Sequence, residues 1–361
     1  MKKKIAIIVG AIFSFFVVGC IALLMVYNSS LKEVETNKDE VKTINFIVEN
    51  GSTTTQIIDS LYSKKLIKSK YAAYVFVKLN NNYMMQAGVY ELNNGMTVDE
   101  ILTKISNGEV IDNSITVTFV PGKRITNYAK VINKNFGYSE ADVLKTLSDK
   151  KYLQGLIDKY WFLTEDILND KLYYALEGYL APNTYFFDKN ATIPQIIDKL
   201  LSTTEVELNK VKDKINNSKY SIHEILTMAS IVELEGANSN DRYGVAGVFY
   251  NRLQNGWALG SDVTTYYAEQ IEMSDRDLYQ AELDEANDYN TRSNTMAGKL
   301  PVGPICNPGI ESINAAVEPQ KHDYFYFVAD KNKKTYFAKT YSEHVTIINK
   351  LKKDGLWYTY E

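Results

Sequence analysis

The chain has 361 residues, of which 45% are hydrophobic and 23% are charged, so it can bury the cores of about two domains. Lysine and arginine number 40 against 44 aspartates and glutamates, and this balance argues against a dedicated nucleic-acid-binding protein. Two cysteines, Cys20 and Cys306, are too few for a disulfide framework or a four-cysteine zinc site, and the three histidines form no HExxH motif. We therefore expect no metal and no cofactor.

An uninterrupted apolar segment follows the first four residues. Residues 5–27 contain no charged side chain and are long enough, at ~1.5 Å per residue, to cross a ~30 Å hydrocarbon core. Lys2, Lys3 and Lys4 precede this segment, and positive residues favour the cytoplasmic side of a membrane. The sequence predicts a cytoplasmic tail (1–4), a single-pass transmembrane anchor (5–27) and an extracytoplasmic remainder, so that the protein is localised to the cell membrane.

A lipoprotein signal is the alternative for this segment. Residues 17–20 (VVGC) resemble a lipobox, but the apolar run continues for six residues beyond Cys20. With either signal we expect most of the chain to lie outside the cytoplasm, tethered to the membrane. Cys20 and Cys306 would then lie at different depths, and we expect no disulfide between them.

A small module follows a polar linker over residues 28–42. Ile44, Phe46 and Val48 alternate as in a strand, and helical spacings follow from about residue 52 and again over 70–79. A return strand (88–92) and a helix (97–106) complete the pattern. This order of elements resembles a LysM-like βααβ module, a fold associated with binding of N-acetylated glycans, over residues 43–110.

Residues 111–361 are predicted to form a mixed α/β domain with its core over about 160–361. It opens with a strand over 115–119, a turn at Pro121-Gly122 and a helix over 126–132. The chain lacks the G-x-G-x-x-G, P-loop and G-x-S-x-G motifs, so nucleotide binding and serine hydrolysis are unsupported. The predicted fold class is α+β, with the transmembrane helix, the LysM-like module and this domain in order.

One predicted helix carries an acid on its apolar face. Ser221 and Glu224 have the spacing of a capping box, and Gly236 is a natural helix end. Glu233 lies 11 positions after Ile222, which at 100° per residue brings it within about 20° of that residue and so into the middle of the apolar stripe. Burial and the negative end of the helix dipole both favour the protonated form, which a general acid needs.

The orientation of a second carboxylate and a possible ion pair complete this prediction. Glu235 points about 200° away from Glu233 on a regular helix, so the two are not close partners. The alternative to a catalytic role for Glu233 is a structural ion pair, for which Arg242 and Arg252 are near enough in sequence.

Six ordered motifs resemble those of the endolytic murein transglycosylases, the YceG-like family. They are LEGYLAPNTY (176–185), ASIVELE (229–235), VAGVFYNRL (245–253), LGSDVT (259–264), YNT (289–291) and LPVGPICNPG (300–309). Segments 324–328 and 336–344 also fit the family pattern. The sequence departs from it at Asn183, Val263 and residues 292–294, which affects fine substrate contacts rather than Glu233.

The resemblance implies an endolytic lytic transglycosylase acting on nascent peptidoglycan. Such an enzyme cleaves the β-1,4 bond between N-acetylmuramic acid and N-acetylglucosamine and leaves a 1,6-anhydro end. Because the 6-hydroxyl of the sugar is the nucleophile, one carboxylate is enough, whereas ordinary glycosidases use two. Glu233 would protonate the leaving oxygen and then accept the proton of the 6-hydroxyl.

The resemblance also implies residues that shape the site, each with a structural role equally open. These candidates for contact with sugar are Glu235, Asn251, Arg252, Asp262, Thr264, Tyr289 and Asn290. The expected partners are glycan strands, the membrane and the cell-wall synthases of elongation or division. The alternative functions are a muramidase that uses water and a non-catalytic glycan-binding scaffold for those synthases.

Overall fold

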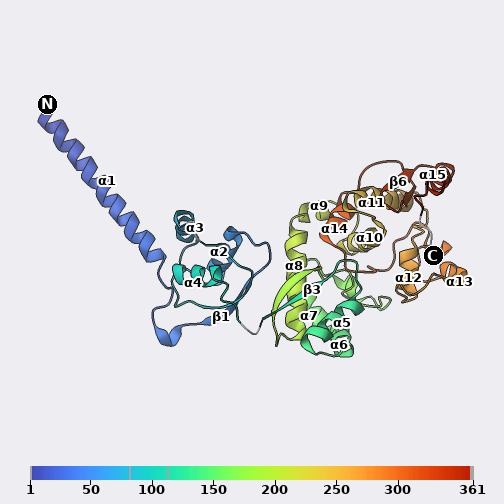
Figure 1. Ribbon diagram of the computed structural model, residues 1–361, viewed down its shortest axis with the longest axis horizontal. Coiled ribbons are helices and arrows are strands. Elements are labelled where there is room, and N and C mark those ends of the chain that lie inside the picture. Colours follow the sequence, from blue (N-terminus) through green and yellow to red (C-terminus); the bar gives the residue numbers. More distant parts are fainter. Residues whose placement is uncertain (1, 81–82, 112–113, 358–361) are drawn as a thin grey trace. The chain divides into compact units, whose positions relative to one another are not determined.

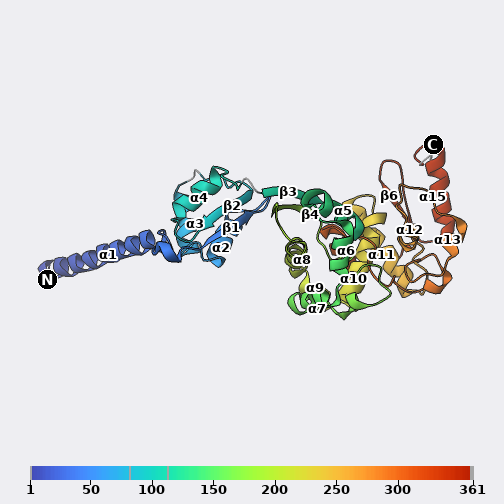
Figure 2. The same cartoon turned by 90° about the horizontal axis from the view of Figure 1, so that it is seen from below.

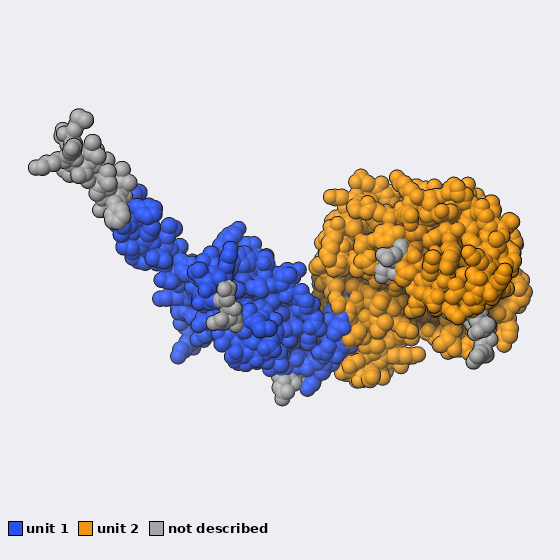
Figure 3. Space-filling view, turned by 45° about the horizontal axis from the view of Figure 1, so that its top comes forward, with its two compact units in different colours: residues 1–117, 184–189 blue, residues 118–183, 190–361 orange. Residues whose placement is uncertain are grey.

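The computed structural model describes residues 2–80, 83–111 and 114–357 (Figures 1 and 2). The side chains of helical residues 2–14 and 239–240 lie outside the described part. The chain divides into two compact units, which Figure 3 shows in different colours. Unit 1 comprises residues 1–117 and 184–189, and unit 2 comprises residues 118–183 and 190–361.

Unit 1 is built on an antiparallel pair of strands, β1 (Thr43–Val48) and β2 (Gly88–Asn93), with Phe46 opposite Tyr90. The helices of this unit are α1 (Lys2–Ser30), α2 (Thr54–Ser63), α3 (Lys70–Leu79) and α4 (Val98–Ser106), with a 3₁₀ turn at Lys38–Glu40. The predicted order of strand, two helices, strand and helix is confirmed. Binding of glycan by this module stays a prediction.

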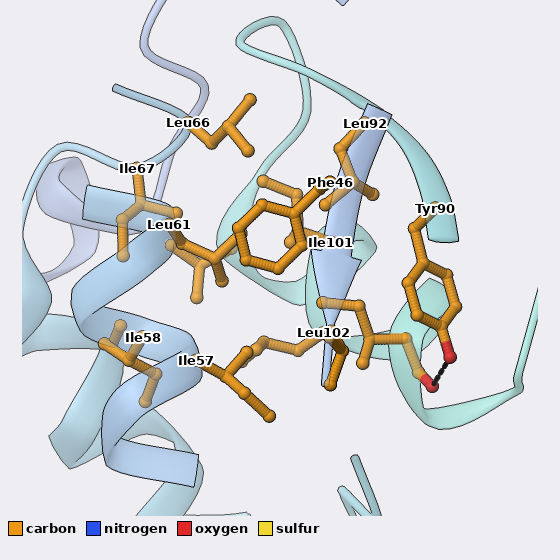
Figure 4. Close-up of a cluster of buried hydrophobic side chains, with 14 residues drawn as sticks. Phe46, Ile57, Ile58, Leu61, Leu66, Ile67, Tyr90, Leu92, Ile101 and Leu102 are labelled. Carbon is orange, nitrogen blue, oxygen red and sulfur yellow. Dashed lines mark hydrogen bonds between the residues drawn. The ribbon is translucent and has the colours of Figure 1, made fainter. Parts of the chain in front are cut away.

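The core of unit 1 lies between its sheet and its helices (Figure 4). Phe46 of β1 and Leu92 of β2 are fully buried, and α2 contributes Ile58 and Leu61. The alternation along β1 therefore points its apolar side chains inward, as the period of two requires. Each large apolar side chain buried in this way contributes about 1.5–3 kcal/mol to stability.

The predicted membrane anchor needs correction. Residues 5–27 do lie in a helix, α1, but in the part of the chain whose side chains are described no helix is long and apolar enough to cross a membrane. Lys2, Lys3 and Lys4 lie outside the described side chains. The single-pass anchor, its orientation and the cell-membrane localisation are therefore withdrawn.

The predicted α+β fold class is thus wrong in its transmembrane element. What the structure has is a mixed architecture of helices and short two-stranded sheets. The remaining strands pair as β3 (Ser114–Phe119) with β4 (Asn183–Asp188), and β5 (Tyr326–Ala329) with β6 (Thr335–Ala338).

The helices of unit 2 surround a buried central helix, α10. In chain order they are α5 (Ile125–Phe136), α6 (Glu140–Ser148), α7 (Lys150–Lys159), α8 (Ile193–Asn209), α9 (Lys212–Asn216), α10 (Ile222–Glu235), α11 (Ser239–Gln254), α12 (Asp262–Ala268), α13 (Gln280–Asp284), α14 (Ile310–Val317) and α15 (Tyr341–Lys353). Short 3₁₀ turns lie at Glu165–Leu168 and Asn294–Met296.

Helix α10 is buried on all sides rather than along one stripe. Thr227 and Ser230, which lie off the predicted apolar stripe, are fully buried as well. Helices α11, α12 and α14 pack against it. Its start at the capping box of Ser221 and Glu224 is confirmed. The single-stripe interpretation was too narrow because three helices cover α10.

Candidate active site

Glu233 lies in the last turn of α10, and its side chain is 6% exposed. Its Oε1 accepts a hydrogen bond from Nη2 of Arg242 on α11 at 2.9 Å. Its Oε2 accepts one from the backbone N–H of Gly309 at 2.9 Å and one from Oγ of Ser312 at 2.7 Å. Helices α10, α11 and α14 therefore meet at this carboxylate.

Gly236 makes room for the ion pair between Glu233 and Arg242. A Cβ atom at Gly236 would lie 2.6 Å from Cγ of Arg242 and 2.9 Å from the carbonyl oxygen of Val232. The predicted helix end at Gly236 is confirmed, but its φ of −72° is one that any residue adopts. Glycine is needed here because the side chain of Arg242 folds back across the end of α10.

The start of α14 also faces Glu233. Gly309 is the N-cap of this helix, and its free N–H points at the carboxylate together with the positive end of the helix dipole. Arg242, Gly309 and Ser312 therefore present three hydrogen-bond donors to the carboxyl group of Glu233, two of them from the start of α14.

Two loops border the Glu233 side chain. Gly122, in the predicted turn after β3, has a φ of +74°, and a Cβ there would lie 3.6 Å from Cγ of Glu233. The N–H of Gly122 donates to the carbonyl of Asn307 at 2.9 Å, which joins this turn to the loop before α14. We call residues 121–124 the first wall and residues 305–309 the second wall of the site.

Glu235 and Arg252 do not contact Glu233. Oε1 of Glu235 accepts a hydrogen bond from Oγ of Ser261 at 2.6 Å, and burial raises the pKa of Glu235 above its ordinary value. Nε of Arg252 donates to the carbonyl of Phe325 at 2.8 Å, and burial lowers the pKa of Arg252. Of the two arginines weighed as ion-pair partners, Arg242 is the one that binds Glu233.

Asn251 supports the segment that leads into β5. Its Nδ2 donates to the carbonyls of His322 and Tyr324, both at 2.9 Å. Arg252 binds the next carbonyl, that of Phe325, so the two residues fasten this segment to α11.

Three other predicted site residues are enclosed in unit 2. Tyr289 is 1% exposed, and Thr264 and Asn290 are completely buried. The hydroxyls of Thr264 and Thr291 share a hydrogen bond of 2.8 Å, and Oδ1 of Asn290 accepts one from Oγ1 of Thr265 at 2.7 Å. These side chains shape the loops around α12 from inside.

Asp262 is the most exposed of the predicted residues. Its Oδ1 pairs with Nη1 of Arg292 at 2.6 Å, and both side chains are largely open to solvent. An exposed pair of this kind contributes ~0–1 kcal/mol to stability. Contact of Asp262 with sugar stays a prediction, as it does for Glu235.

Glu177 was missed among the site residues. This carboxyl is 1% exposed, and burial raises its pKa to about 8. Its Oε1 accepts hydrogen bonds from the N–H of Ile125 at 2.9 Å and from Nδ2 of Asn307 at 3.2 Å. The sequence offered one signal, because Glu177 follows Leu176 and precedes Tyr179, both typical core residues.

A cavity of about 930 Å³ lies in another part of unit 2, away from Glu233. Its walls come from residues 169–173, 286–289 and 295–302, and Tyr289 is the predicted site residue that lines it. Lys171 and Asp288, on opposite walls, pair with each other at 3.0 Å.

Comparison with known proteins places this site in a family. The YceG-like family matches residues 46–350. The endolytic murein transglycosylase of Bacillus subtilis is 36% identical over 320 residues, which is 88% of this chain and 87% of that protein. The endolytic murein transglycosylase of Streptococcus pneumoniae is 28% identical, over 87% of this chain but only 59% of that longer protein.

A solved structure gives the same assignment. The crystal structure of a yceG-like protein of Listeria monocytogenes matches with a TM-score of 0.60 and 35% identity, over 85% of this chain and 99% of that one. The family match over residues 46–350 includes both the walls around Glu233 and the elements that hold them. The chain therefore belongs to the YceG-like family.

Proposed function

We propose that this protein is a lytic transglycosylase that cleaves the glycan strands of peptidoglycan. Membership of the YceG-like family supports this proposal, together with the name endolytic murein transglycosylase of two relatives. The observation that carries it is the position of Glu233, a nearly buried carboxylate held by Arg242, Gly309 and Ser312.

The reaction needs one carboxyl group in two protonation states. As the bond between N-acetylmuramic acid and N-acetylglucosamine breaks, the carboxylic acid of Glu233 gives its proton to the leaving oxygen. The resulting carboxylate takes the proton of the 6-hydroxyl, whose oxygen bonds to C1 of the same sugar. The proton is returned, no water is consumed and a 1,6-anhydro end is formed.

The surroundings of Glu233 support both halves of this cycle. Arg242, Gly309 and Ser312 hold the carboxylate that receives the second proton. A glycan that covers the site would exclude water from Glu233 during the proton transfers. The sugar's own 6-hydroxyl is the nucleophile, so this chemistry needs no second carboxylate, whereas ordinary glycosidases use two.

Mass spectrometry of the products tests this proposal. Purified peptidoglycan treated with the full chain should release fragments that end in 1,6-anhydro sugar, each one water lighter than a hydrolysis product. Fragments with a reducing end would instead indicate a muramidase, which cleaves the bond with water. Binding of glycan without any cleavage would favour the scaffold function.

We also propose that cell-wall synthases of elongation or division are protein partners. The family resemblance supports this, because an enzyme that cuts nascent strands works where strands are being made. Cross-linking in growing cells should recover such synthases with the chain. Recovery only of proteins that are unrelated to the cell wall would count against the proposal.

A further inference from the structure

Glu177 touches both loops that border Glu233. The N–H of Ile125, directly after the first wall, donates to Oε1 of Glu177 at 2.9 Å and lies 3.2 Å from its Oε2. Nδ2 of Asn307, in the second wall, donates to the same Oε1 at 3.2 Å. One buried carboxyl group therefore bridges the two segments between which Glu233 lies.

Asn307 carries this link to the site. Its Oδ1 accepts from the backbone N–H of Gly178 at 3.1 Å and of Leu180 at 3.0 Å. Its Nδ2 also donates to the carbonyl of Lys123 in the first wall at 3.1 Å. With its amide group fully used, Asn307 has one orientation, and two residues later the N–H of Gly309 meets Glu233.

The surroundings of Glu177 leave little room for other arrangements. Gly178 has a φ of +84°, and a Cβ there would lie 2.3 Å from Cβ of Pro304 and 3.4 Å from the carbonyl oxygen of Cys306, so the segment after Glu177 packs on the second wall and the residue before it. Oε2 of Glu177 accepts from the hydroxyl of Tyr267 at 3.2 Å. The oxygens of the Glu177 carboxyl group therefore bind hydrogen-bond donors of the protein itself.

We infer that Glu177 is a positioning residue that holds both walls of the site so that Gly309 keeps its hydrogen bond to Glu233. This inference rests on the proposed function of Glu233. Glu177 itself lies behind the walls and does not touch the glycan. Loss of the hydrogen bond between Glu177 and Asn307 should displace the N–H of Gly309 and leave binding of the glycan largely unchanged.

The test compares Glu177→Leu with Tyr267→Phe in the full chain. Glu177→Leu removes Oε1, the atom that accepts from both Ile125 and Asn307. We expect kcat to fall by about 10- to 100-fold, the scale of a misplaced catalytic geometry, with KM within about twofold of the wild type. Tyr267→Phe removes only the hydroxyl that donates to Oε2 and keeps the ring that lies over Arg124, so kcat should stay within about twofold.

A double variant and an exchange measurement sharpen the test. Because Asn307→Ala cuts the same link, the double variant Glu177→Leu/Asn307→Ala should be no slower than the slower single variant. Hydrogen exchange at the Gly309 amide should accelerate in Glu177→Leu and not in Tyr267→Phe. This exchange does not depend on activity, so it distinguishes failure of the inference from failure of the proposed function.

Several results would overturn the inference. These are an unchanged kcat in Glu177→Leu, an equal loss in Tyr267→Phe, or unchanged exchange at Gly309. If Glu177→Leu does not fold, Glu177→Asp takes its place, since it keeps the carboxyl group but shortens the side chain. Failure of both variants to fold would assign Glu177 a purely structural role and would also overturn the inference.

Discussion

At the scale of single residues, the site depends on hydrogen bonds that the sequence does not reveal. The helical phase placed Glu233 correctly in the last turn of a buried helix. The donors of Gly309 and Ser312 come from the start of α14, more than 70 positions later, and no local pattern predicts that they meet this carboxylate. Arg242 was one of two possible partners, and the missing side chain of Gly236 leaves room for it.

Removal of the Ser312 hydroxyl tests one of these hydrogen bonds. Ser312→Ala should cost about 0.5–1.5 kcal/mol of stability and should lower kcat, because the carboxylate of Glu233 loses one of its donors. Ser293→Ala is the matched control: this serine is also buried, but its hydroxyl shares a hydrogen bond of 3.0 Å with Thr295, outside both walls of the site. Equal effects of both variants on kcat, measured by release of glycan fragments, would contradict the prediction.

The buried acid Glu177 predicts how stability depends on pH. Burial raises its pKa from an ordinary value of 4.5 to about 8, so between these values the folded chain holds a proton that the unfolded chain releases. The contribution of Glu177 to the free energy of unfolding is therefore full below about pH 4.5 and is lost as pH rises towards about 8.

Urea denaturation at about pH 5 and at about pH 8 measures this contribution. Relative to Glu177→Gln, which cannot ionise, the wild type should lose stability between the two values. Other titrating groups occur in both proteins and cancel in the difference. A difference between wild type and variant that does not change with pH would show that Glu177 does not titrate in this range.

At the scale of elements, the sequence predicted helices and strands better than it predicted their environment. Alternating residues, helical spacings and the capping box at Ser221 located β1, β2, α2, α4 and α10. The single apolar stripe of α10 was too narrow a prediction, because burial on all sides depends on helices distant in the chain. Asn251 and Asn290 bind backbone carbonyls of neighbouring loops, and their contact with sugar stays a prediction.

The turn after β3 provides a test at this scale. Gly122 has a φ of +74°, so Gly122→Ala should cost about 1–2 kcal/mol, and its methyl group would lie beside Glu233. Gly137→Ala is the matched control, since Gly137 has a φ of +80° with no atom within 4 Å of an added Cβ. The melting temperature should fall by a similar amount in both variants, and only Gly122→Ala should also lose activity. Comparable activity in the two would show that the first wall does not bear on Glu233.

At the scale of the whole molecule, composition correctly indicated about two folded units, each with its own core. The anchor prediction was wrong: among the residues whose side chains the structure describes, no helix is long and apolar enough to cross a membrane. Family membership was predictable because motifs from 176 to 309 fall in the family's order, and a single motif would not have been enough.

The core of unit 1 can be tested within the full chain. Phe46→Ala should destabilise this unit by about 3–5 kcal/mol, because it leaves a cavity where a completely buried ring was packed. Leu79→Ala, at a side chain that is 71% exposed, should change stability by less than about 0.5 kcal/mol. Hydrogen exchange of the amides in α2 and α4 reports both effects, and equal exchange in the two variants would contradict this description of the core.

The central claim is that Glu233 is the acid and base of glycan cleavage. The most direct test is the rate at which Glu233→Gln releases fragments from purified peptidoglycan, with Glu235→Gln as the control on the same helix. General acid–base catalysis contributes about 10²–10⁴-fold, and we expect Glu233→Gln to lose activity at the upper end of this range. Glu235→Gln should keep most of its activity, because Glu235 binds Ser261 rather than Glu233. An active Glu233→Gln that is merely destabilised by loss of its ion pair with Arg242 would contradict the account.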